Sequence, residues 1–144
     1  MHVGSVLRGA IGAVILAAAL AGAARAQGRN QFDGTWLVAL QCDAARDGAA
    51  GYTFTFAASV KDGVLHGDHG VPGQAASLSL DGTIQPDGRA LLFAHGLTGD
   101  PTYNVGRVAP VTPYSYHLQS RFEGGHGTGT RLELRPCSAV FTKQ

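Results

Sequence analysis

The segment His66-Gly67-Asp68-His69 is the one place in the chain where residue types and spacing suggest metal chemistry. Two imidazoles three positions apart, with a carboxylate between them, are groups that bind zinc. A zinc site needs at least three protein ligands, and the other candidates, His95 and His117, lie far away in the sequence. We therefore expect no metal and no cofactor, and interpret the segment as a polar loop at the end of a strand.

Signatures of catalysis are missing from the sequence. It has no Gly-x-Ser-x-Gly motif, no phosphate-binding loop and no His-Glu-x-x-His motif. Several acidic residues fall in expected turns (Asp62, Asp81, Asp87 and Asp100), where Asp is favoured because its side chain bonds to the local backbone. The sequence predicts a protein that is not an enzyme, although a site assembled from residues far apart in the chain stays open as a weaker alternative.

The long connection 98–113 is the strongest candidate for a functional segment. It contains Asp100-Pro101, Tyr103-Asn104 and Arg107, with further prolines that stiffen it. Loops of this length without secondary structure are uncommon in compact domains and often bind other molecules. The alternative is a structural cover over one end of the fold.

Residues 1–26 have the pattern of a cleavable secretion signal. Arg8 precedes an apolar run over 10–22, and Ala24-Arg25-Ala26 offers the small-x-small pattern that a signal peptidase accepts. A membrane anchor is the alternative, but the run is shorter than the ~20 residues that a bilayer core requires. We expect residues 27–144 to form one domain in the periplasm or secreted, without a membrane association once the signal is removed.

The chain has two cysteines, Cys42 and Cys137. In an exported protein, one disulfide between them is the default expectation. Removing Arg8 and Arg25 with the signal leaves 9 of the 11 Lys and Arg residues against 10 Asp and Glu, a net charge near −1. This balance, with no basic run, argues against nucleic acid or anionic lipid as a partner.

Apolar and polar residues alternate with period two along most of the chain, which predicts strands. The alternation is clear over 52–60 and 114–123. It continues over 131–135, where Leu132 and Leu134 alternate against Arg131, Glu133 and Arg135, so that the leucines are expected to face the core. The segment 89–97 is apolar on both faces and its orientation is left open. About eight antiparallel strands, each with one apolar face, require a sandwich or a closed barrel.

Two observations favour an all-β, eight-stranded up-and-down barrel. Cys42 ends the first expected strand and Cys137 begins the last, and these strands are neighbours in such a barrel, which places Leu40 opposite Ala139 and Val38 opposite Phe141. Tight turns at 61–63, 85–88 and 124–127 alternate with long connections at 43–51, 68–76 and 98–113. The long connections are therefore expected to surround one end of the barrel.

The segment Phe32-Asp33-Gly34-Thr35-Trp36 resembles the Gly-x-Trp signature of the calycin superfamily, which includes lipocalins, avidins and small periplasmic metalloprotease inhibitors. The resemblance implies that Trp36 plugs the closed end of the barrel, with Arg135 or Arg131 as a cover; the alternative is an ordinary core aromatic. The Thr-Asp-Tyr-like corner of lipocalins is not found, and no biotin-contacting residues of avidins can be carried over. The chain as a whole also resembles small exported bacterial proteins.

These observations predict a non-catalytic binding protein. Six aromatic residues are expected to point inward and to fill the barrel, which favours a protein partner held by the loops at one end. The alternative is a carrier that binds a small apolar ligand at the barrel mouth. In either case the residues expected to contribute lie at the mouth of the barrel: Asp43, Arg46, His66, His69, Tyr103, Asn104 and Arg107.

Overall fold

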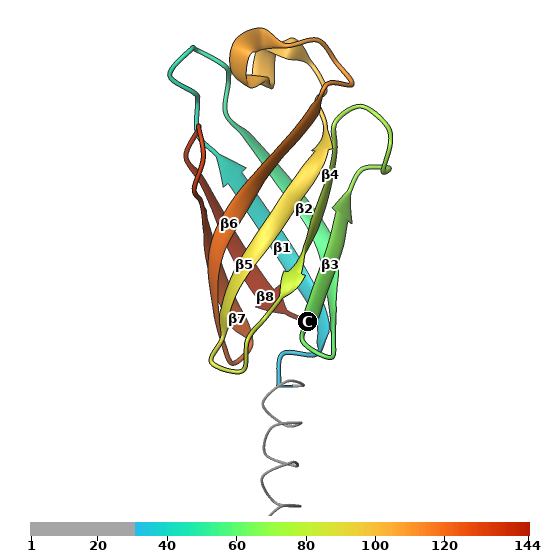
Figure 1. Cartoon of the computed structure of the whole chain (residues 1–144), viewed down its shortest axis with the longest axis vertical. Helices are drawn as coiled ribbons and strands as arrows, with labels where there is room; N and C mark the ends of the chain where they lie inside the picture. Colours follow the sequence, from blue (N-terminus) through green and yellow to red (C-terminus); the bar gives the residue numbers. More distant parts are fainter. Residues whose placement is uncertain (1–30) are drawn as a thin grey trace, which may run out of the picture.

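The computed structural model describes residues 31–144, and the expected signal at 1–26 lies outside them. The described chain forms an all-β closed barrel of antiparallel strands (Figure 1). The strands are β1 (Gly34–Cys42), β2 (Tyr52–Lys61), β3 (Val64–His69), β4 (Ser77–Thr83), β5 (Arg89–Leu97), β6 (Pro113–Glu123), β7 (His126–Arg131) and β8 (Cys137–Lys143). Within this range, no helix has the length and apolar composition needed to span a membrane.

Each strand pairs with the next, and β1 closes the barrel against β8. The closing register places Leu40 opposite Ala139 and Cys42 opposite Cys137. The two cysteines form a disulfide that joins residues 95 positions apart. The predicted fold, register and disulfide are therefore confirmed.

The two ends of the barrel differ. Tight turns join β2 to β3, β4 to β5 and β6 to β7 at the end where the C-terminus lies, which we call the closed end (Figure 1). The longer connections 43–51, 70–76 and 98–112 gather at the opposite end, which we call the mouth. This arrangement agrees with the alternation of loop lengths in the sequence.

Aromatic side chains fill the closed end of the barrel. Trp36 is fully buried, and its indole N–H donates to the carbonyl oxygen of Phe32 at 2.8 Å. Phe122 packs edge-on against the Trp36 ring and also contacts Phe141. A filled core is thus present in this half of the barrel.

The expected cover of Trp36 by Arg135 is wrong. Arg135 bonds to loop carbonyls at the mouth, at the other end of the barrel. Lys143 of β8 lies over the Trp36 ring instead, with its Nζ 6.0 Å from the ring centroid. A cation near the C-terminal end of β8 reaches the closed end because β8 runs from the mouth towards it.

The orientation expected for 131–135 is also wrong, and the correction shapes the mouth. Strand β7 ends at Arg131, Leu134 is 81% exposed, and Arg135 is 4% exposed. The inward positions of β7 are Gly127, Gly129 and then Arg131. A Cβ at Gly127 would lie 2.7 Å from the Phe122 ring, so only glycine leaves enough room for this ring. The inward-facing residues of β7 end with Arg131, which lies at the mouth.

Strand β5 is expected as a strand from the sequence, with its inward face left open, and it turns Ala90, Leu92 and Ala94 inward. Its outward Leu91 and Phe93 are exposed, and the rings of His95 and His117 flank Phe93 on the outer wall. The small inward alanines leave space for larger residues on facing strands.

Candidate functional site

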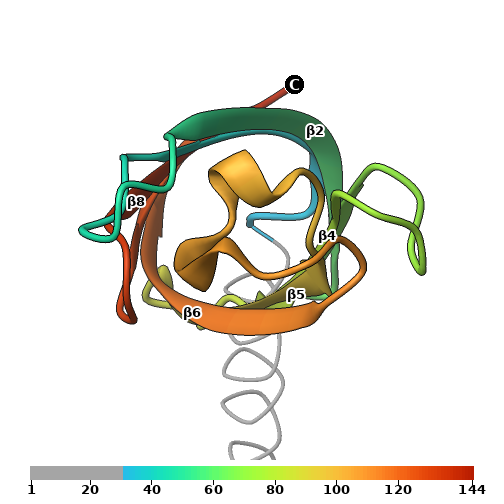
Figure 2. The same cartoon turned by 90° about the horizontal axis from the view of Figure 1, so that it is seen from above.

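A cavity of about 730 Å³ opens at the mouth of the barrel, under the connection 98–112. We call this connection the strap, because it crosses the barrel opening when seen from above (Figure 2). Strands β2, β5, β6 and β7 provide walls, and the strap provides much of the cover. The expectation of a completely filled barrel therefore holds for the closed end only.

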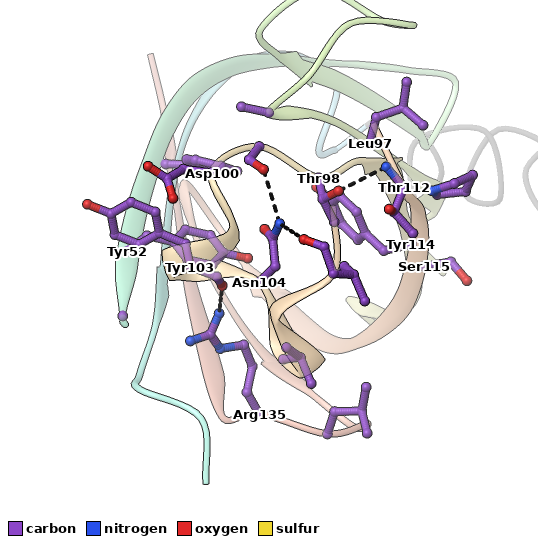
Figure 3. A pocket seen from close by; sticks show the side chains of 18 of the residues that line it. Tyr52, Leu97, Thr98, Asp100, Tyr103, Asn104, Thr112, Tyr114, Ser115 and Arg135 are labelled. Carbon is purple, nitrogen blue, oxygen red and sulfur yellow. Dashed lines mark hydrogen bonds between the residues drawn. The ribbon is translucent and has the colours of Figure 1, made fainter. Parts of the chain in front are cut away.

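The strap has a defined conformation. It contains two short 3-10 turns, η1 (Pro101–Tyr103) and η2 (Val105–Arg107). Asn104 lies between them, is buried, and donates from Nδ2 to the carbonyls of Gly99 and Val108 at 3.0 and 2.9 Å (Figure 3). One amide thus holds the two sides of the strap together.

Hydrogen bonds also fix the strap to the neighbouring loop 43–51. The backbone N–H of Gly106 donates to the Asp47 carboxylate, and Arg107 donates to the carbonyl of Gly48 at 2.9 Å. The backbone N–H donors of Gly106 and Ala49 hold the pKa of Asp47 below its usual range. These contacts hold the cover of the cavity in place.

Arg135 joins three loops at the mouth. Its guanidinium donates to the carbonyl of Tyr103 at 2.8 Å (Figure 3). It also donates to the carbonyls of Asp43 (3.0 Å), Ala49 (3.2 Å) and Ala50 (2.8 Å). Carbonyl dipoles therefore surround this buried cation and satisfy its donors. Arg135 is a structural cross-link between the strap and the rim.

Three tyrosines line the mouth half of the barrel. Tyr114 stacks above Tyr116 along β6, with ring centroids 6.2 Å apart, and its hydroxyl donates to the carbonyl of Ser77 at 2.8 Å. Tyr52 of β2 packs against Phe54, whose other side is stacked on His69 at 3.8 Å. Burial raises the pKa of all three phenols, so they remain protonated at neutral pH.

Arg131 also lines the cavity, in a different environment from Arg135. Its guanidinium carbon lies 3.9 Å from the centroid of the Tyr116 ring, and Nη1 makes a long 3.7 Å contact with Cys137 Sγ. Its Nε is buried and makes no hydrogen bond to any residue of the described range. Burial lowers the pKa of Arg131, but an arginine still carries its charge at neutral pH.

Of the residues that the sequence predicted to bind a partner or ligand, some line the cavity and others hold the loops together. Tyr103 and Asn104 line the cavity, Asn104 mainly as the brace of the strap. Asp43 contributes its carbonyl to Arg135, Arg107 fastens the strap, and Arg46 is exposed on the loop 43–51.

The two histidines of the possible zinc motif lie on opposite faces of β3. His69 points inward and stacks on Phe54, whereas His66 lies on the outer wall. There His66 Nδ1 is 2.6 Å from Asp81 and Nε2 is 3.0 Å from Asp68. The hydrogen bond to Asp81 raises the pKa of His66, and no cluster of three or more potential metal ligands occurs in residues 31–144.

Sequence reasoning did not identify Tyr52, Tyr114, Tyr116 or Arg131 as site residues. The tyrosines were assigned to the core, since a mouth position cannot be distinguished from a core position by alternation. The inward direction of Arg131 was available from the Gly-Thr-Gly-Thr-Arg pattern of 127–131, in which glycines and Arg131 share one face.

Comparison with known proteins adds no further assignment. No family model, no curated protein and no solved structure matches this chain. The site is therefore interpreted from its own geometry.

Proposed function

We propose that this protein binds a small molecule in the cavity at the mouth of the barrel. The observation that carries the proposal is the cavity itself, about 730 Å³ beneath a strap that is fastened to the rim. Ligand-binding pockets are typically about 300–1,000 Å³, largely apolar, with a few placed polar groups. The size and lining of the cavity therefore favour a small-molecule carrier, whereas the sequence alone favoured binding to a protein partner.

The chemistry of the lining supports the same function. Phe54, Leu97, Val105 and Val108 offer apolar contacts, while tyrosines and Arg131 concentrate the polar groups at the wall formed by β6 and β7. An amphiphilic molecule matches this division, because burying its apolar part is favourable and its polar part meets hydrogen-bond donors. A fastened strap also lowers the entropy that must be lost on binding.

A protein partner at the mouth is the second candidate. Tyr103, Val111 and Leu134 are large, exposed apolar or aromatic residues near the rim. Exposed apolar side chains at a rim offer surface that a protein partner can bury. A partner that covered the strap would bury these side chains without entering the cavity.

The cellular setting belongs to the same proposal. The signal-like segment 1–26 and the disulfide support export to the periplasm or outside the cell. The closed eight-stranded barrel and the buried Trp36 after Gly34 support membership of the calycin superfamily. On this proposal the protein is a non-catalytic carrier.

Titration with N-phenyl-1-naphthylamine, a neutral apolar fluorophore, tests the proposal. We expect a saturable rise in fluorescence with one site per chain. Val108→Trp adds bulk to a lining position and should weaken binding of the fluorophore. Val140→Trp makes the same change on the outer wall of β8 and should leave binding unchanged.

Two results would contradict the small-molecule proposal. The first is no saturable fluorescence change with the unmodified protein. The second is equal affinity in the Val108→Trp and Val140→Trp variants, because a probe bound at the outer surface is insensitive to the cavity. Capture of a protein partner that is lost on Leu134→Ser substitution would support the second candidate.

A further inference from the structure

The geometry points to a ligand with an anionic head group, a carboxylate, that pairs with Arg131 inside the cavity. This inference rests on the proposed small-molecule function and specifies the chemical class of the ligand. It is carried by a cation at the cavity wall that forms no ion pair within residues 31–144.

Arg131 is incompletely satisfied by the protein. One face of its guanidinium covers the Tyr116 ring, and among residues 31–144 its one hydrogen bond is the long contact to the Cys137 sulfur. A guanidinium has five N–H donors, and leaving buried donors unbonded is costly. Arg135 at the same mouth differs from Arg131, because four backbone carbonyls accept hydrogen bonds from its guanidinium.

The acids near the mouth are already engaged elsewhere. Glu133 is held by His117, with Oε1 at 2.6 Å from Nδ1 and Oε2 accepting from the backbone N–H of His117. Asp100 lines the cavity but accepts from the backbone N–H of Thr102 at 2.8 Å. No ion pair joins either acid to Arg131 in the described chain. Glu133 acts on Arg131 only from beyond ion-pair distance, so the guanidinium donors of Arg131 are available to a ligand.

One tyrosine adds a donor near the guanidinium. Tyr52 lines the cavity together with Arg131, and the charge of Arg131 acts on its phenol. Tyr116, whose ring lies under the guanidinium, is 2% exposed and is not part of the cavity lining. Burial keeps the Tyr52 phenol protonated at neutral pH, so its hydroxyl can donate to an anion in the cavity.

A carboxylate fits this arrangement better than a neutral polar group. The planar fork of arginine matches the two oxygens of a carboxylate, and charge-assisted hydrogen bonds are stronger than neutral ones. The apolar side chains of the strap and of β5 then surround the rest of the molecule. The ligand is an amphiphilic monocarboxylate with its head at Arg131 and its apolar body beneath the strap.

The test is displacement of bound N-phenyl-1-naphthylamine by two matched molecules, dodecanoate and dodecanol. We expect dodecanoate to compete more strongly. We expect Arg131→Met to weaken dodecanoate by roughly 10- to 100-fold, the effect of losing a hydrogen bond to a charged group, and to change dodecanol by less than about 3-fold. Arg131→Lys, which keeps the charge and loses the fork, should give an intermediate affinity.

Arg121→Met is the matched control. It removes the same charge from an exposed position on β6, outside the cavity lining, and should leave both affinities unchanged. Fluorophore binding together with equal competition by acid and alcohol would overturn the inference while leaving the proposed function intact. A loss of dodecanoate affinity in Arg121→Met as large as in Arg131→Met would also overturn it, because the effect would then reflect net charge.

Discussion

The two arginines at the mouth lead to opposite predictions for stability and binding. Arg135→Met removes a buried donor group from four loop carbonyls, whereas Arg131→Met removes a group with one long hydrogen bond. The first change should destabilise the fold, and the second should mainly affect ligand binding. The same chemical substitution thus separates a structural arginine from a binding one.

The size of the Arg135 effect follows from its contacts. A hydrogen bond to a charged donor contributes roughly 1.5 kcal/mol at the low end, and rehydration of the carbonyls at the mouth recovers part of the loss. We expect Arg135→Met to lower the free energy of unfolding by about 3 kcal/mol. A domain of this size changes its Tm by roughly 4 °C per kcal/mol, which gives a decrease of about 12 °C.

Arg131→Met should change the free energy of unfolding by less than about 1 kcal/mol. It loses a cation–π contact worth roughly 0.5–2 kcal/mol, but it also removes the cost of holding a poorly satisfied charge in a partly buried site. Thermal denaturation followed by circular dichroism, without ligand and with the disulfide intact, measures both variants. Equal losses of Tm in the two variants would refute the separation of roles, as would an unchanged Tm in Arg135→Met.

Three further predictions concern the barrel itself. Replacing both cysteines by serine should lower the free energy of unfolding by up to about 4–5 kcal/mol, because the disulfide closes a loop of 95 residues; guanidinium denaturation measures this. Gly127→Ala should cost about 1–3 kcal/mol, since its Cβ would meet the Phe122 ring at 2.7 Å, while Gly125→Ala has room and should be near neutral in the same assay. The hydrogen bond to Asp81 raises the pKa of His66. Protonated His66 therefore stabilises the folded state fully at pH values below its unfolded-state pKa near 6.5, and this contribution is lost as the pH rises through the higher folded-state pKa. Because that ring is half exposed, His66→Gln should reduce the decline in unfolding free energy above pH 6.5 by less than about 1 kcal/mol, measured by urea titrations over a pH series.

The fold could be predicted from the sequence because several local signals agree on it. Period-two alternation predicts the strands, and the alternating loop lengths and the positions of Cys42 and Cys137 both favour a barrel in which the first and last strands are neighbours. The error at 131–135 arose where the strand stops. Leu132 and Leu134 are apolar but lie beyond the last residue of β7, where facing is set by the path of the loop and alternation no longer applies.

The site was harder to predict than the fold. Tyr114 and Phe122 both occupy inward positions of β6, yet one lines the cavity and the other fills the closed end. Alternation predicts whether a residue faces the inside or the outside of the barrel. It does not predict where along the barrel axis the residue lies, or how large the side chains opposite it are. The role of Arg135 was missed for a related reason, because its partners are backbone carbonyls that no residue type marks.

Native mass spectrometry of the protein after incubation with dodecanoate shows whether the mouth of the barrel holds a ligand. We expect a single bound acid per chain, which is lost in Val108→Trp, reduced in Arg131→Met and retained in Val140→Trp. Several weak adducts that do not saturate, or a complex that survives equally in all three variants, would contradict a binding site within the mouth of the barrel.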